Sequence, residues 1–295
     1  MRTETGPGGE GYQADRETFA AFVEEKIRTE GVPGLSVAVV KGDRIVWAKG
    51  FGLADLATST PATPETSYLW FSMTKIATAT AVVRLAEAGG LELDAPADEY
   101  YRGFKVVSQP TPVSVRHLLS HSSGLANPIP IRWVYPASGP VPDRRAFVER
   151  LLGRNRRLKF VPGERASYSN LGYLVLGEVI SEVSGIRYEE YVREEILLPL
   201  GMNRTGFSYP PAGGEAATGY HPMRPPLIPI FRAALPRGVV GLRQGKYVAF
   251  NPFYVKGPAY GGLIGGVEEA ARLILLHLNG GRVGETRLLS AASVA

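Results

Sequence analysis

The chain has 295 residues, and its content of 44% hydrophobic and 21% charged residues is that of a folded globular protein. Its formal net charge is +5, but the basic residues form only short clusters without interleaved aromatic residues, which argues against a nucleic-acid partner. The sequence has no cysteine, which excludes disulfides, a cysteine nucleophile and thiolate metal sites.

No stretch approaches the ~18 consecutive apolar residues of a membrane-spanning helix, so we expect no membrane span. Residues 1–14 are rich in glycine and polar side chains and lack the apolar core of a signal peptide. We therefore expect a flexible leader over 1–14 and a cytoplasmic protein.

The first predicted elements are a helix and a hairpin. Apolar residues at helical spacing over 15–31 indicate a helix. Two strand-like runs, 35–40 and 45–48, flank a set of turn residues and predict a β-hairpin. A second helix is expected to begin at Ser72 and to end before the glycine stop signal at Gly89.

The rest of the chain combines helices with a long irregular segment. Helical spacing predicts a short helix within 113–125 and longer helices over 143–152, 171–185, 188–198 and 267–278. Residues 209–260 are rich in proline and glycine, and we expect a long loop there that serves as a lid or linker. Strand-like residues with tight turns follow over 260–266.

Ser72 and Lys75 carry the sharpest chemical signal. On a helix, positions three apart lie on one face, about 5–6 Å apart at Cβ, so Lys75 can reach the Ser72 hydroxyl. A serine needs a neighbouring base to act as a nucleophile. Lysine can be that base when burial lowers its pKa, and the apolar residues after Lys75 favour burial. In the alternative interpretation, Ser72 only starts the helix and Lys75 is solvated.

Tyr168, Ser169 and Asn170 lie in a polar turn before another predicted helix. A tyrosinate beside a lysine ammonium can shuttle protons, because the opposite charge favours the phenolate. The Asn170 amide can hydrogen-bond a substrate or hold Lys75 in place. In the alternative interpretation, the tyrosine packs its ring and the asparagine caps the helix.

The motif Ser72-Met73-Thr74-Lys75, followed about ninety residues later by Tyr168-Ser169-Asn170, resembles the serine β-lactamase and penicillin-binding protein superfamily. The resemblance is to its class C-like branch, which includes the family VIII esterases and the D-alanyl-D-alanine carboxypeptidases. Three further stretches match this branch, at residues 50–55, 116–125 and 261–263. The Gly-x-Ser-x-Gly elbow of α/β-hydrolases does not occur in the sequence.

The resemblance implies an α+β fold, in which an antiparallel sheet is flanked by helices and carries an inserted helical lobe. Residues 1–295 would then form a single β-lactamase-like domain. Within it, residues 15–75 and 238–295 are expected to form the α/β lobe, and residues 76–237 the mostly helical lobe.

The resemblance also implies a role for each motif residue. Ser72 would be the acylated nucleophile, while Lys75 and Tyr168 would share the base and acid roles. Asn170 would bind the substrate. We predict a serine hydrolase that acts on small esters without a cofactor or a metal. A β-lactamase or D-amino-acid peptidase is the second interpretation, and a catalytically inactive acyl-binding or self-associating relative is the third.

Members of this superfamily carry a third motif, Lys-Thr-Gly or His-x-Gly, which does not occur in this sequence. In the superfamily, the strand of this motif supplies an oxyanion-hole N–H and pairs in the sheet with the N-terminal hairpin. We therefore expect an unpaired hairpin edge, which favours association into a homo-oligomer.

His117 and His121 have a spacing that can bind a metal on a helix, but no third ligand is evident nearby. We expect both to be structural and to hydrogen-bond the loop after the short helix. Seven aromatic residues of the long irregular segment either wall an apolar acyl pocket or pack the segment onto the body. They are Tyr220, Phe231, Tyr247, Phe250, Phe253, Tyr254 and Tyr260.

Overall fold

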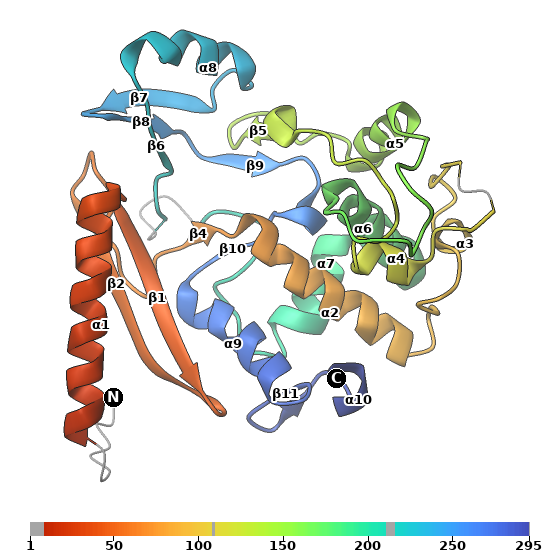
Figure 1. Cartoon of the computed structure of the whole chain (residues 1–295), viewed down its shortest axis with the longest axis horizontal. Coiled ribbons are helices and arrows are strands. Elements are labelled where there is room, and N and C mark those ends of the chain that lie inside the picture. Colours follow the sequence, from red (N-terminus) through yellow and green to blue (C-terminus); the bar gives the residue numbers. More distant parts are fainter. Residues whose placement is uncertain (1–8, 108–109, 211–215, 295) are drawn as a thin grey trace.

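The computed structural model describes residues 9–107, 110–210 and 216–294. Figure 1 shows two parts of the chain: the N-terminal helix and β-hairpin lie on one side, and a mostly helical part lies on the other. This arrangement confirms the predicted α+β fold. In the described part of the chain, no helix is long and apolar enough to cross a membrane.

The N-terminal elements are helix α1 (Gly9–Glu30) and the hairpin strands β1 (Gly34–Lys41) and β2 (Arg44–Asp55). Both the helix and the hairpin were predicted from the sequence. The helix begins at Gly9, earlier than predicted. The expectation of a flexible leader is therefore wrong for residues 9–14, which belong to α1. Residues 1–8 of the predicted leader lie outside the described residues.

The hairpin forms a three-stranded antiparallel sheet with the short strand β3 (Thr60–Pro61), in the order β1-β2-β3. Helix α1 packs on β2, and helix α9 (Val267–Leu278) contacts both hairpin strands from the other side (Figure 1). Among the described residues, β1 pairs with β2 on one edge. A sheet edge without a strand partner exposes unpaired N–H and C=O groups.

Helix α2 (Thr74–Glu87) is preceded by a 3₁₀ turn (Phe71–Met73), so the predicted helix start at Ser72 is confirmed to within a turn. The turn is held by two short strands, β4 (Tyr68–Leu69) and β10 (Ile264–Gly265), which pair antiparallel. The indole N–H of Trp70 donates to the Gly265 carbonyl at 2.9 Å and adds a buried tie. These contacts hold the chain before α2 against the chain before α9.

The helical part is assembled from six short or medium elements. They are α3 (Ala97–Tyr100), α4 (Val115–Leu119), α5 (Arg144–Arg154), α6 (Asn170–Ser184), α7 (Tyr188–Val192) and a π-helical turn (Arg193–Leu197). Helix α6 is central, because residues 170–180 are all buried and the helix contacts α2, α4, α5 and α7. Its contact with α2 brings the residues at its start next to the start of α2.

The ends of α6 follow from its sequence. The Ser169 hydroxyl accepts a hydrogen bond from the Gly172 N–H at 3.2 Å and caps the N terminus. Gly185 ends the helix with a φ of 74°, a left-handed conformation that costs glycine no Cβ clash. Helix α6 therefore begins and ends where the sequence predicts, and its buried sides follow from an almost continuous apolar run.

Residues 211–215 lie outside the described residues. In the rest of 209–260, the expectation of one long loop is wrong, because this segment forms several strands and a helix. It contains β6 (Tyr220–Pro222), α8 (Ile228–Ala234), β7 (Val240–Gln244), β8 (Tyr247–Phe250) and β9 (Phe253–Val255). Strands β6, β8 and β7 form a small sheet, and β9 pairs with β5 (Val134–Pro136). The signal that was missed is the turn at Gly245, with a φ of 58°, which joins β7 and β8 as a hairpin.

The last elements are β11 (Arg282–Val283), β12 (Thr286–Arg287) and α10 (Ala291–Val294). The predicted helix over 267–278 is confirmed as α9. The lobe boundary expected at 237–238 stays a prediction. Elements on its two sides contact each other: β6 pairs with β8, and Arg232 of α8 donates to the Gly241 carbonyl of β7.

Candidate functional site

Ser72 and Lys75 lie on one face at the start of α2. The Lys75 ammonium nitrogen Nζ is 3.2 Å from the Ser72 Oγ, within hydrogen-bonding distance. Ser72 is exposed, whereas Lys75 is only 7% exposed. The structure therefore places an accessible hydroxyl beside a buried amine, as the spacing of the two residues predicted.

Tyr168 and Asn170 reach the same point from the start of α6. The Tyr168 hydroxyl lies 2.7 Å from the Ser72 Oγ. Lys75 Nζ donates to the Asn170 Oδ1 at 3.0 Å. The four residues singled out from the sequence thus meet in one cluster, although 95 residues separate Lys75 from Asn170.

A third partner fixes Lys75. Its Nζ also donates to the main-chain carbonyl of Tyr260 at 2.7 Å, in the 3₁₀ turn Pro258–Tyr260. An ammonium group has three N–H donors, and here three acceptors surround it. A neutral amine has only two N–H groups. Because the Asn170 and Tyr260 oxygens can only accept, the lone pair of the neutral amine is left for the Ser72 hydroxyl.

The surroundings of Lys75 favour that neutral form. Burial lowers the pKa of Lys75 from 10.5 to about 8. Its Nζ lies 5.0, 5.3 and 5.6 Å from the ring centroids of Tyr168, Tyr173 and Tyr260. In the described part of the chain, no carboxylate forms an ion pair with Lys75 that would offset the burial. At pH 8 a large fraction of Lys75 is therefore a free base.

His117, in α4, and His121, just after it, both have backbone partners. The His117 Nδ1 accepts from the Ser114 N–H at 3.2 Å and so completes the cap of its own helix. The His121 Nδ1 accepts from the Ser169 N–H at 3.2 Å, in the loop before α6. Among the described residues, no group of three or more His, Asp or Glu side chains is placed to hold a metal ion. Both side chains thus make hydrogen bonds to the backbone, but the expected partner is wrong: His117 bonds to the residue before α4, and His121 bonds to the loop before α6, rather than to the loop directly after α4.

Sequence reasoning missed several residues that shape the cluster. Asn127 Oδ1 accepts from the Asn170 N–H at 3.1 Å, and the Ser169 hydroxyl donates to the Ala126 carbonyl at 2.9 Å. The Tyr260 carbonyl was also missed. No local pattern marks these groups, because each acts through a backbone atom or through a contact between segments far apart in the sequence.

An apolar cavity of about 800 Å³ borders the cluster at Phe71, the residue before Ser72. Its walls come from the hairpin, β4 and the 209–260 segment. Four of the seven aromatic residues singled out from the sequence line it: Tyr220, Phe231, Phe250 and Phe253. Of the others, Tyr254 packs on Tyr135 and Tyr209, and the Tyr247 hydroxyl donates to the Gly31 carbonyl at 2.5 Å.

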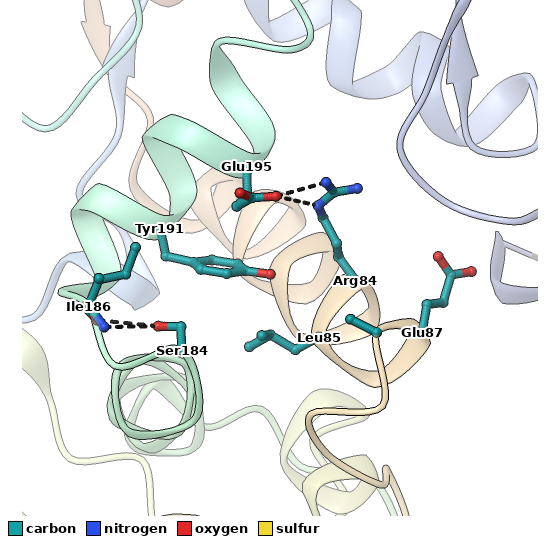
Figure 2. A pocket seen from close by; sticks show the side chains of 8 residues that line it. Arg84, Leu85, Glu87, Ser184, Ile186, Tyr191 and Glu195 are labelled. Atoms are coloured by element: carbon teal, nitrogen blue, oxygen red, sulfur yellow. Dashed lines mark hydrogen bonds and ion pairs between the residues drawn. The ribbon is translucent and has the colours of Figure 1, made fainter.

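A second pocket, of about 500 Å³, lies at the opposite end of α2 (Figure 2). Arg84 and Glu195 form an ion pair there at 2.7 Å, beside the ring of Tyr191. With a helical rise of 1.5 Å per residue, Arg84 is about 18 Å along the helix from Ser72. The hydroxyl of Ser184 in this pocket is bonded to the backbone of Ile186, without a neighbouring base. This pocket is separate from the Ser72 cluster.

The family model described as Beta-lactamase matches residues 19–295. The chain belongs to the beta-lactamase family. This membership and the fold confirm the superfamily resemblance that was drawn from the two motifs.

Beta-lactamase-family relatives include penicillin-binding protein 4* of Bacillus subtilis, with 30% identity over 172 residues, 58% of this chain and 37% of that protein. Among solved structures, the octameric penicillin-binding protein homologue from Pyrococcus abyssi matches with a TM-score of 0.74 and 30% identity, over 95% of this chain and 59% of that one. A class C beta-lactamase from Rhodobacter sphaeroides matches with a TM-score of 0.65 and 26% identity, over 93% of this chain and 68% of that one. This beta-lactamase-family chain spans less than two fifths of the length of the curated relatives it matches.

Proposed function

We propose that this chain is a serine hydrolase that forms an acyl-enzyme on Ser72 and acts on small esters with an apolar acyl group. The observation that carries the proposal is the position of Ser72, whose Oγ lies 3.2 Å from Lys75 Nζ and 2.7 Å from the Tyr168 hydroxyl. A weak nucleophile thus lies between two groups that can accept and return its proton.

In the first half-reaction, Ser72 Oγ forms a bond to the ester carbonyl carbon while its proton passes to the Lys75–Tyr168 pair. The carbonyl π electrons move onto the oxygen, which becomes an oxyanion. When this intermediate collapses, the bond to the alkoxide breaks and the alkoxide takes the proton from the pair. The acyl group then stays on Ser72.

In the second half-reaction, water attacks the acyl carbon and gives its proton to the same pair. Collapse of the second intermediate releases the acid and returns the proton to Ser72 Oγ. The Ser72 N–H, in the 3₁₀ turn at the start of α2, is our proposed donor to the oxyanion. One such donor is typically worth ~10²–10³ in rate. Asn170 uses its Oδ1 for Lys75, which leaves its amide N–H₂ for the substrate.

The ester preference is supported by the apolar cavity beside Phe71. Pockets of this size bind small apolar ligands with a few placed polar groups. The second candidate is a β-lactamase or D-amino-acid peptidase, which the likeness to a class C beta-lactamase and to penicillin-binding proteins supports. The same Ser72, Lys75 and Tyr168 would serve there, because a lactam carbonyl is attacked in the same way.

The test compares hydrolysis of a short p-nitrophenyl ester and of a chromogenic cephalosporin by the unchanged chain and by Ser72→Ala. Ser184→Ala is the matched control, because its hydroxyl bonds only to the local backbone of Ile186. We expect ester turnover that Ser72→Ala abolishes and Ser184→Ala preserves. Equal turnover in all three chains would refute the proposal, and faster cephalosporin turnover would favour the second candidate.

The third interpretation is a catalytically inactive acyl-binding or self-associating relative, because the Lys-Thr-Gly or His-x-Gly motif does not occur in the sequence. We propose that the edge of β1 opposite β2 lets copies of the chain associate, a proposal supported by the octameric state of the Pyrococcus abyssi homologue. Light scattering tests it. A monomer at all concentrations would contradict it, and Val39→Lys, at an exposed position of β1, should reduce association because charged side chains blunt sheet edges.

A further inference from the structure

His121 contacts Tyr168 of the candidate site but has no role in the proposed mechanism. Its ring centroid lies 4.5 Å from that of Tyr168 and 5.1 Å from that of Tyr173. Its Nδ1 accepts the Ser169 N–H, and its main-chain carbonyl accepts the Ser167 N–H at 2.8 Å. His121 therefore bonds to the residues on both sides of Tyr168 and packs against its ring.

We propose that His121 is a positioning residue that holds Tyr168 against Ser72, and that it does so only in its neutral form. The inference rests on the proposed function, since it assigns a role in placing a group of that mechanism. It predicts that protonation of His121 stops activity independently of protonation of Lys75.

The hydrogen bond from Ser169 requires a neutral His121 ring. A neutral imidazole has one acceptor nitrogen, and here Nδ1 takes that role, which puts the ring proton on Nε2. An imidazolium has two N–H donors and no acceptor. Protonation would therefore leave the Ser169 N–H, on a residue that is 1% exposed, facing another donor. The loop that carries Tyr168 would have to move away.

The charges around His121 also favour its neutral form. The titratable groups that face His121 are Lys75 from α2, Tyr168 from the loop before α6 and Tyr173 from α6, with Tyr260 behind Lys75. No carboxylate is among these groups, so none of them supplies an acidic side chain that could stabilise an imidazolium. Burial, and after it the positive charge of Lys75, lower the pKa of His121 below its usual value of 6.5. The neutral form is thus maintained until the solution becomes clearly acidic.

The backbone conformation of His121 tolerates an asparagine substitution that tests the role of the ring. Its φ is 58°, in the left-handed region, where asparagine is among the few tolerated non-glycine residues. In His121→Asn, the amide oxygen can take the place of Nδ1 as acceptor for the Ser169 N–H, but the side chain cannot be protonated. His117→Asn is the matched control, because His117 Nδ1 also accepts a backbone N–H in the same segment but bonds to Ser114.

The experiment measures kcat/KM for a p-nitrophenyl ester between pH 4.5 and 9 for the three chains. Each group that must be deprotonated adds a tenfold loss of kcat/KM per pH unit below its pKa. The unchanged chain should therefore lose about tenfold per pH unit below pH 8, where Lys75 is protonated. Once His121 is protonated as well, the loss should steepen to about a hundredfold per pH unit. His121→Asn should keep the tenfold limb throughout and lose at most about tenfold at pH 8, which is the worth of an aromatic contact. His117→Asn should retain the steeper acid limb.

A single tenfold limb in the unchanged chain would overturn the inference, and so would a hundredfold limb that persists in His121→Asn. The histidine NMR titration of the Ser72→Ala chain gives a readout that needs no turnover. We expect the His121 signal to titrate below 6.5 and to move upward when Lys75→Met removes the nearby charge. Absence of Ser72-dependent hydrolysis would refute the proposed function, while a His121 that titrates above 6.5 would refute this inference by itself.

Discussion

The hydroxyl of Ser72 lies 2.7 Å from the hydroxyl of Tyr168, although 96 residues separate them in the sequence. Helix α6 makes this possible, because its buried body packs against α2 and its capped start turns the Tyr168 loop toward the start of α2. The candidate site is thus the meeting point of two helix starts.

Lys75→Met should lower kcat by about 10²–10⁴, the usual contribution of a positioned acid–base group. Lys75→Arg should not restore activity, because a guanidinium stays protonated and cannot be the base. Steady-state kinetics on the ester substrate measures both. Lys105→Met, at an exposed lysine, is the control and should behave as the unchanged chain. Activity close to normal in Lys75→Met would remove Lys75 from the mechanism.

The burial of Lys75 should also be visible in stability. Its pKa is about 8 in the folded chain and near 10.5 in the unfolded one, so between these values the unfolded chain binds more protons. The free energy of unfolding should therefore rise with pH over that range, relative to Lys75→Met, which lacks this titration. Urea unfolding of both chains at pH 7, 8, 9 and 10 gives the difference. A difference that does not change with pH would mean that Lys75 is not desolvated.

Tyr168→Phe should reduce kcat by about 10²-fold or more, because it removes one of the two groups that handle the Ser72 proton. The phenyl ring keeps the contact with His121, so the melting temperature should change little. Tyr100→Phe removes a hydroxyl that accepts only the Glu92 N–H and should leave kcat unchanged. A Tyr168→Phe chain with full activity would show that Lys75 alone handles the proton.

Arg144→Met should destabilise the chain by about 3–5 kcal/mol, because it leaves the carboxylate of Glu178 buried without its ion-pair partner. Arg144 donates to Glu178 at 2.7 Å, and Glu178 is 3% exposed in the middle of α6. Arg145→Met breaks exposed pairs with Glu149 and Glu182 and should cost about 0–1 kcal/mol. Chemical denaturation measures both changes. Equal losses would mean that Glu178 is not a buried support of α6.

The motif residues could be predicted from the sequence because their chemistry is local. Ser72 and Lys75 lie one turn apart on a helix that the apolar pattern and Gly89 delimit. Ser169 and Asn170 mark a helix start in the same way. The hairpin and helix α9 were also predicted, because turn residues separate two strand-like runs in the first and the apolar residues follow helical spacing in the second.

The features that the sequence did not predict depend on contacts between distant segments. The strands within 209–260 are short and lie in a segment rich in proline and glycine, and they become stable only by pairing with one another and with β5. The Tyr260 carbonyl reaches Lys75 through its main chain, which carries no sequence signal. His121 reaches Tyr168 only because α4 and α6 pack together. Tertiary packing decides such contacts, and a single sequence does not show it.

The central claim is that Ser72 becomes acylated, and the most direct test is mass spectrometry of the chain quenched during turnover of a p-nitrophenyl ester. We predict a mass gain of one acyl group, mapped to the peptide that holds Ser72, and absent from Ser72→Ala. The adduct should accumulate more slowly as the pH falls below 8, when Lys75 becomes protonated. Turnover without any adduct on that peptide, or an adduct that persists in Ser72→Ala, would contradict the account.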